Sequence, residues 1–106
     1  MHALFTPCAI GNLEIKNRIV MLALHLNYCP DGEVNSKLVN YYTARAKGGA
    51  GLIIVGGCAI DDVGPAPMMI SLSDYRFLPG LQRLTSEVKN AGARIAAQLY
   101  QAGRYT

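Results

Sequence analysis

Two side chains of this sequence, His25 and Gln98, stand where they could bind a ligand. His25 follows a nearly continuous apolar run, Arg18 to Ala23, which is typical of a parallel strand covered on both faces. A neutral imidazole at that point can donate one hydrogen bond to a bound ring system and accept another from it. Nearby backbone carbonyls can satisfy the same imidazole, so a structural role and a ligand-binding role for His25 both stay open.

Gln98 carries a primary amide inside the apolar run Ile95 to Leu99, where the amide must find hydrogen-bond partners. An unpaired buried amide costs about 1–3 kcal/mol. Because an amide both donates and accepts, Gln98 suits the uracil-like edge of an isoalloxazine ring. A buried water or a polar residue of a neighbouring strand would satisfy the amide as well.

The glycine pair Gly56-Gly57 ends another apolar run. Glycines at the end of a strand permit either a tight backbone turn or the close approach of a flat ligand. We interpret the segment from Gly56 to Ser73 as one long loop, which carries Asp61-Asp62 and two prolines. Loops longer than ~12 residues in compact domains are often functional.

An alternation of strand, helix, strand, helix and strand positions these residues. The strands are predicted at Arg18–Ala23, Gly51–Val55 and Arg94–Leu99. Strands joined through helices run parallel with right-handed crossovers, so the loops after their carboxyl ends share one rim. Ligands of barrels and open α/β sheets bind at that rim, and we therefore expect His25, Gly57 and Gln98 to lie together.

Local signals define two helices and a hairpin. Asn35 is predicted to cap a helix over Ser36–Lys47, which Gly48-Gly49 ends. The second helix has Pro79 in its first turn, ends at Gly92, and has apolar residues at helical spacing: Leu81, Leu84, Val88 and Ala91. Leu4 to Asn17 is predicted as a short hairpin that turns at Gly11-Asn12.

The composition argues against several classes of protein. The net charge of +3 comes from 10 Lys and Arg against 7 Asp and Glu, and the cations are scattered, unlike those of a nucleic-acid-binding surface. The longest apolar runs are far below the ~18 residues of a membrane span. Three dispersed cysteines, Cys8, Cys29 and Cys58, fit neither a disulfide framework nor a metal site, so we predict no metal ligands and a cytoplasmic protein.

A series of short motifs, in register from Leu4 to Arg104, resembles the old yellow enzyme family of NADH:flavin oxidoreductases, and most closely its bacterial 2,4-dienoyl-CoA reductases and 2-enoate reductases. The motifs are Leu4-Phe5-Thr6-Pro7, Ile10-Gly11, Lys16-Asn17-Arg18-Ile19-Val20-Met21, Asp31-Gly32, Tyr41-Tyr42, Arg45-Ala46-Lys47-Gly48-Gly49, Gly51-Leu52-Ile53-Ile54, Pro79-Gly80-Leu81, Gln98-Leu99 and Ala102-Gly103-Arg104.

The resemblance implies an α/β fold, the N-terminal portion of an FMN-binding (β/α)8 TIM barrel in which a hairpin precedes a βαβαβ unit. It places the backbone of Ala23 and Leu24 and the side chain of His25 against the flavin, with Gly57 and Gln98 at its pyrimidine edge. Many relatives have Pro-Met in place of Ala23-Leu24 and His in place of Gln101. Both departures border the space above the flavin and bear on the choice of substrate.

The implied reaction is reduction, by NAD(P)H through FMN, of the C=C bond of an α,β-unsaturated acid or enoyl thioester. The resemblance puts the proton-donating tyrosine, the phosphate-binding loops and any iron–sulfur cluster beyond Thr106, so no catalytic residue is expected in this chain. Residues 1–106 would form part of one FMN-binding domain without an internal boundary, well short of the ~250 residues of a closed barrel.

The chain alone is therefore expected to be inactive, and to associate with the rest of a barrel or with itself through its open sheet edge. Two alternatives stay open. One is a non-catalytic α/β fragment or assembly module without bound flavin. The other is a flavin-free barrel that binds a phosphorylated substrate at the same rim.

Overall fold

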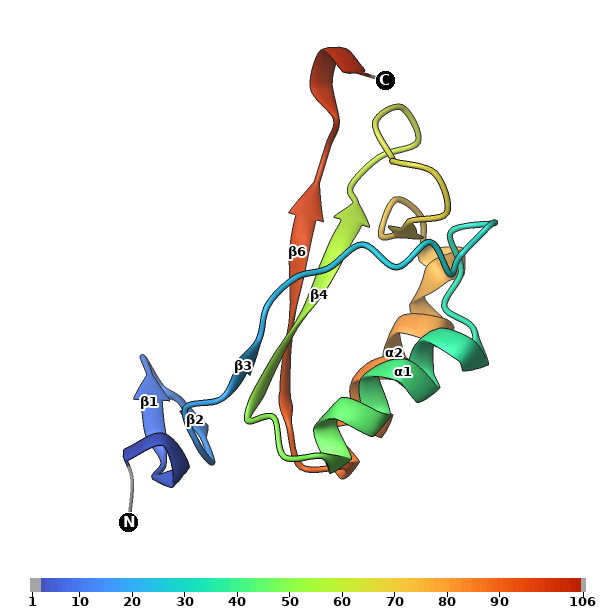
Figure 1. Cartoon of the computed structure of the whole chain (residues 1–106). Helices are drawn as coiled ribbons and strands as arrows, with labels where there is room; N and C mark the ends of the chain where they lie inside the picture. Colours follow the sequence, from blue (N-terminus) through green and yellow to red (C-terminus); the bar gives the residue numbers. More distant parts are fainter. Residues whose placement is uncertain (1–2, 106) are drawn as a thin grey trace.

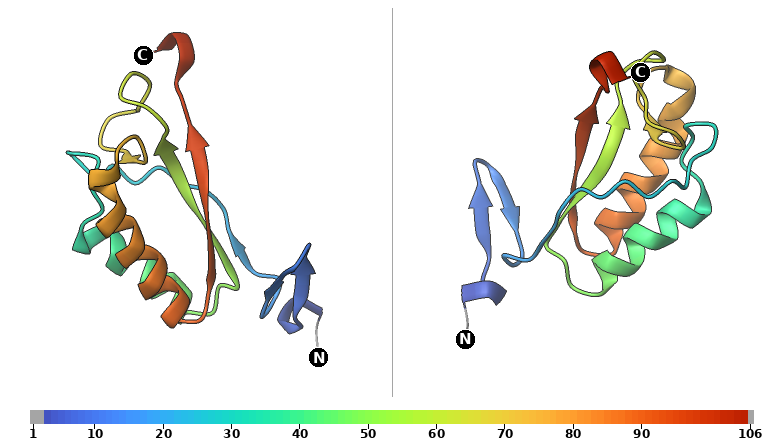
Figure 2. Two further views of the ribbon diagram at one scale, coloured as in Figure 1. Left: turned by 180° about the vertical axis from the view of Figure 1, so that it is seen from behind. Right: turned by 45° about the horizontal axis from the view of Figure 1, so that its top comes forward.

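A computed structural model describes residues 3–105 and shows a parallel sheet with two helices on one face (Figure 1). The helices α1 (Ser36–Lys47) and α2 (Leu78–Asn90) lie side by side, and the opposite face of the sheet carries no helix in any view (Figure 2). The strands are β3 (Val20–Met21), β4 (Leu52–Ala59), β5 (Ile70–Ser71) and β6 (Arg94–Tyr100). The hairpin of β1 (Cys8–Ile10) and β2 (Leu13–Ile15) lies near the amino ends of these strands (Figure 1). Short 3-10 turns span Ala3–Phe5, Tyr75–Phe77 and Gly103–Tyr105.

β4 is the central strand, and all of its partners are parallel to it. β6 pairs along one side from Leu52↔Arg94 to Ala59↔Tyr100. On the other side β3 pairs at Leu52 and Ile53, and β5 takes its place at the far end of β4. The prediction of a parallel βαβαβ unit after a hairpin is confirmed.

Two predicted strand boundaries are wrong. The strand expected over Arg18–Ala23 pairs only at Val20 and Met21, because the chain leaves β4 after Met21. The strand expected to end at Val55 continues to Ala59. A register shift between Val55 and Cys58, with Gly57 at φ +55, forms a β-bulge that lets β4 run through the glycine pair. The predicted loop from Gly56 to Ser73 is shortened accordingly, and it contains β5.

The core lies between the helices and the sheet. α1 contributes Leu38, Val39, Tyr42 and Ala46, α2 contributes Leu84 and Val88, and the sheet contributes Ile53, Val55, Cys58 and Ile70. The caps agree with the sequence: Asn35 accepts a hydrogen bond from the Leu38 amide, and Pro79 stands in the first turn of α2. Gly49 and Gly92, which follow the two helices, have φ of +116 and +103. Neither helix within residues 3–105 is long and apolar enough to cross a membrane.

The helix-free face of the sheet exposes apolar side chains. Leu22 is 71% exposed and Leu24 53%, although both follow β3 closely. β6 also has no strand on its outer side among residues 3–105, so its outward backbone groups are unpaired. The described part of the chain therefore completes one hydrophobic layer and leaves a second one open.

Asn17 ties the hairpin to the start of β4. Its amide nitrogen donates to the Gly49 carbonyl over 2.7 Å, and its Oδ1 accepts from the Ile19 amide over 3.1 Å. Asn17 is 9% exposed, and a Cβ at Gly51 would collide with its side chain. A buried amide with both groups paired is costly to remove because its partners lose their bonds.

We predict that Asn17→Ala lowers the free energy of unfolding by about 1–3 kcal/mol. Asn40→Ala serves as the matched control, since Asn40 is exposed on α1 and should change stability by less than about 0.5 kcal/mol. Urea denaturation followed by circular dichroism measures both. Equal effects of the two substitutions would contradict the role given to Asn17.

Candidate functional site

The segment that follows β3 lies against β4, backbone to backbone, at Gly56. A Cβ built on Gly56 would collide with the backbone N, C and O atoms of Leu24. Only a residue without a side chain permits this approach of one backbone segment to another, a use of the glycine that the sequence did not predict. The contact draws the segment after β3 across the rim of the sheet.

Gln98 of β6 is bonded to the bulge of β4. Its Oε1 accepts a hydrogen bond from the Gly57 amide over 3.2 Å. The backbone N–H can only donate, so the amide orientation is fixed and Nε2, with two N–H groups, is turned to the other side. Among residues 3–105 no acceptor for Nε2 is recorded. The expectation that Gln98 is buried is wrong: it is exposed, because it belongs to the helix-free face of the sheet.

His25 reaches across to the loop between β4 and β5. Its Nε2 lies 3.0 Å from the carbonyl oxygen of Pro67. A carbonyl only accepts, so Nε2 carries the proton and Nδ1 is the acceptor in the neutral ring. Nδ1 is the atom that faces Gly57, at 3.8 Å from a Cβ built there. Backbone therefore satisfies one ring nitrogen, and the other points toward the glycine.

The structure brings the predicted site residues together. Leu24 meets Gly56 through its backbone, His25 faces Gly57, and Gly57 bonds Gln98. Ala23 precedes this contact and is half-buried. Met69 completes the group, since its Cε would lie 2.6 Å from a Cβ at Gly57. Sequence analysis missed Pro67 and Met69, for which the only signal was the length of the loop that carries them.

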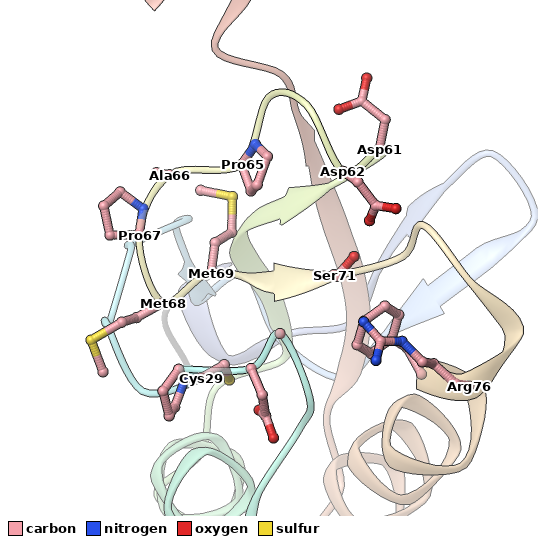
Figure 3. Close-up of a pocket in the computed structure, with 14 residues that line it drawn as sticks. Cys29, Asp61, Asp62, Pro65, Ala66, Pro67, Met68, Met69, Ser71 and Arg76 are labelled. Carbon is pink, nitrogen blue, oxygen red and sulfur yellow. The ribbon is translucent and has the colours of Figure 1, made fainter. Parts of the chain in front are cut away.

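A cavity of about 410 Å³ adjoins this group (Figure 3). In that view Asp61, Asp62, Ser71 and Arg76 lie on the right, and Pro67, Met68 and Cys29 on the left. Its polar side chains are engaged within the protein. The Asp62 carboxylate accepts from Ser73, Asp61 accepts from the amides of Val63 and Gly64, and Arg76 stacks on Phe77 at 4.5 Å from the ring centroid.

Two buried thiols are chemically quiet. Burial raises the pKa of Cys29 to about 11, with a further rise from the Asp31 charge, and burial raises the pKa of Cys58 to about 11 as well. Both are residues of the hydrophobic core. A hydrogen bond from the Gly64 amide, followed by those from Gln101 and Val63, lowers the pKa of Asp61 below its usual value.

The fold and the rim define a class of protein. Parallel strands that present polar groups at their carboxyl ends are typical of ligand-binding barrels and open α/β sheets. Residues 3–106 match the NADH:flavin oxidoreductase / NADH oxidase family, and the chain belongs to this family of oxidoreductases.

Relatives support the assignment along the whole chain. The sequence is 56% identical over 105 residues to a metal reductase of Desulforamulus reducens. The matched region covers 99% of this chain and 16% of the relative. It is 40% identical over 106 residues to an NADH oxidase of Thermoanaerobacter brockii, again covering 16% of that protein. The chain thus spans about one sixth of the length of these relatives.

Solved structures agree with the fold. Morphinone reductase in complex with tetrahydroNAD superposes with a TM-score of 0.91 at 30% identity, over 100% of this chain and 29% of that one. The old yellow enzyme homologue of Zymomonas mobilis gives a TM-score of 0.89 at 31% identity over 97% of this chain. The predicted fold, the N-terminal portion of an old yellow enzyme barrel, is confirmed.

The backbone contact at Gly56 leads to one prediction. Gly56→Ala should lower the free energy of unfolding by about 1–3 kcal/mol, because the added methyl group must displace the backbone at Leu24. Gly48→Ala is the control: Gly48 has φ −72, its built Cβ lies 3.3 Å from the Ala44 oxygen, and the change should stay below about 1 kcal/mol. Thermal denaturation compares them, and a neutral Gly56→Ala would contradict the contact.

The raised thiol pKa values lead to another. At pH 8 a rise from 9.0 to about 11 lowers the thiolate fraction of Cys29 and Cys58 roughly 100-fold, so iodoacetamide should modify them far more slowly than in the urea-unfolded chain. Because the folded pKa lies above the unfolded value, deprotonation favours unfolding, and stability should fall as the pH rises from about 9 to about 11. Mass spectrometry of each thiol, with half-exposed Cys8 as the accessible control, measures the rates. Equal rates in folded and unfolded chains would contradict the burial.

Proposed function

We propose that this chain supplies one side of the FMN site of an ene-reductase. The observation that carries the proposal is the Gly57–Gln98 hydrogen bond, which holds the Gln98 amide so that Nε2 is free to donate. A ligand beside it must present an acceptor, and the carbonyl oxygens and unprotonated nitrogen of a flavin pyrimidine edge are acceptors. Nδ1 of His25, 3.8 Å from a Cβ built on Gly57, offers an acceptor beside the same glycine.

The residues present fit a flavin. The edge of a flavin ring needs both donors and acceptors as partners, and Gln98 and His25 offer them. Ala23 and Leu24 would lie against the ring through their backbone. When bound, the flavin supplies two-electron chemistry, accepting hydride from NAD(P)H and delivering it to an alkene conjugated with a carbonyl group.

For the substrate we propose an α,β-unsaturated acid or an enoyl thioester, as for 2,4-dienoyl-CoA and 2-enoate reductases. Among the structural neighbours, 2-naphthoyl-CoA reductase in complex with 2-naphthoyl-CoA gives a TM-score of 0.92 at 32% identity. The departures at Ala23-Leu24 and Gln101 alter the rim where such a substrate would lie. The three free cysteines favour a reducing, cytoplasmic compartment.

The chain by itself is proposed to be inactive. Its helix-free face exposes Leu22 and Leu24, and β6 offers an unpaired edge to further parallel strands. Residues 1–106 are proposed to form part of a single domain, with the proton donor, the phosphate-binding loops and any iron–sulfur ligands supplied by the remainder of the barrel.

A second candidate is an assembly module that binds no flavin. The same exposed apolar face favours it, because such a surface drives association whether or not a cofactor follows. Size-exclusion chromatography with flavin absorbance separates the two. A colourless, well-folded oligomer supports the module, and a yellow, NAD(P)H-oxidising complex formed with the remaining barrel strands supports the reductase.

Gln98→Glu tests the flavin site at its carrying observation. A glutamate still accepts from the Gly57 amide but has lost the Nε2 donor, so the Kd for FMN should rise at least about 10-fold in the assembled barrel. Gln82→Glu, at an exposed position of α2, adds the same charge away from the site and should leave the Kd unchanged. Flavin fluorescence quenching measures both. An unchanged Kd for Gln98→Glu would refute the assigned donor.

A further inference from the structure

The loop between β4 and β5 is fastened at its start by Asp61. Oδ1 of Asp61 accepts from the Val63 and Gly64 amides over 3.1 and 2.8 Å, closing a turn. Oδ2 has a different partner, the side-chain amide of Gln101 at 3.3 Å. One carboxylate therefore links the loop after β4 to the segment after β6.

Gln101 makes this link from the other side. Its Oε1 accepts from the Gly103 amide, and its side chain lies where a Cβ of Gly64 would stand. The Ala102 amide donates to the Gly64 carbonyl over 2.9 Å, so backbone and side chain join the same two segments. Gly64 is buried beneath Gln101 although it belongs to a surface loop. We call the Asp61–Gln101 contact with these bonds the rim latch.

The far end of the loop reaches the proposed flavin site. The Pro67 carbonyl accepts a hydrogen bond from His25 Nε2–H. The Met68 carbonyl accepts one from the Cys29 amide over 3.1 Å. Met69 then packs over Gly57. Pro67 therefore lies between two fastened points of the loop, the rim latch at its start and the Met68–Cys29 bond beside it.

We propose that Asp61 and Gln101 are positioning residues that act through the loop to hold Pro67 on His25 Nε2, leaving Nδ1 turned to Gly57. The inference rests on the proposed function only in one respect, the role of His25 Nδ1 beside a flavin. The latch and the imidazole hydrogen bond are present without any ligand. The neighbouring Asp62 has a different partner, since its carboxylate accepts from the Ser73 hydroxyl.

The side-chain chemistry allows a selective break. In Asp61→Asn the carbonyl oxygen still accepts from the Val63 and Gly64 amides, but an NH2 group replaces the oxygen that accepted from Gln101. Two amide donors then face each other and the latch opens. Adding Gln101→Glu restores a donor–acceptor pair with its direction reversed. Asp62→Asn is the matched control, because it makes the same charge change one residue away.

The experiment measures solvent exchange of the His25 Nε2 proton and of the Ala102 amide by NMR in the assembled barrel, with this chain carrying ¹⁵N and no FMN added. We expect Asp61→Asn to speed both exchanges roughly 3- to 10-fold. The double variant should return them to the original rates, and Asp62→Asn should leave them unchanged.

Two results would overturn the inference. Faster exchange at Ala102 with unchanged exchange at His25 would mean that the latch does not reach the imidazole. Unchanged exchange at both sites would mean that the contact does not hold the loop. Because FMN is absent, either result is independent of the Gln98→Glu titration, and the latch can stand even if the flavin proposal fails.

Discussion

The backbone contact between Gly56 and Leu24 is the constraint from which the rest of the rim follows. The backbone of Leu24, three residues after β3, lies against Gly56 of β4, so the segment after β3 crosses β4 there. The bulge at Gly57 turns one amide out of the ladder and toward Gln98. His25 follows this crossing directly, and its ring lies between Gly57 and the loop at Pro67. Helices, cavity and latch are arranged around this crossing.

Local signals predicted the helical layer well. Asn35, Gly48-Gly49 and Pro79 act through bonds to their own neighbours in sequence, so their effect can be read without knowing the fold. The bounds of the strands were harder to predict from the sequence. β3 is short because β5 replaces it beside β4, and β4 is long because its glycines form a bulge instead of an end. Both outcomes depend on partners distant in sequence.

The candidate site was predicted by topology more than by residue type. Parallel strands place His25, Gly57 and Gln98 at one rim, and the structure has them there. The exposure of Gln98 was not predicted, because an apolar run does not tell which face of a sheet lacks a covering layer. The contacts of Pro67 with His25 and of Asp61 with Gln101 could not be predicted either, because contacts at both ends of a loop determine its path.

One face of the sheet is covered by helices and the other is not, and this difference bears on the order in which such a barrel folds. Leu38, Tyr42, Ile53 and Val88 are buried together in a core between the helices and the sheet. During synthesis the amino-terminal segment leaves the ribosome first, so this layer can consolidate while later strands are still being made. The helix-free face of the sheet, still exposed to solvent, then offers the surface against which the later strands pack. The face that carries Gln98 would then be the last part of the sheet to be covered.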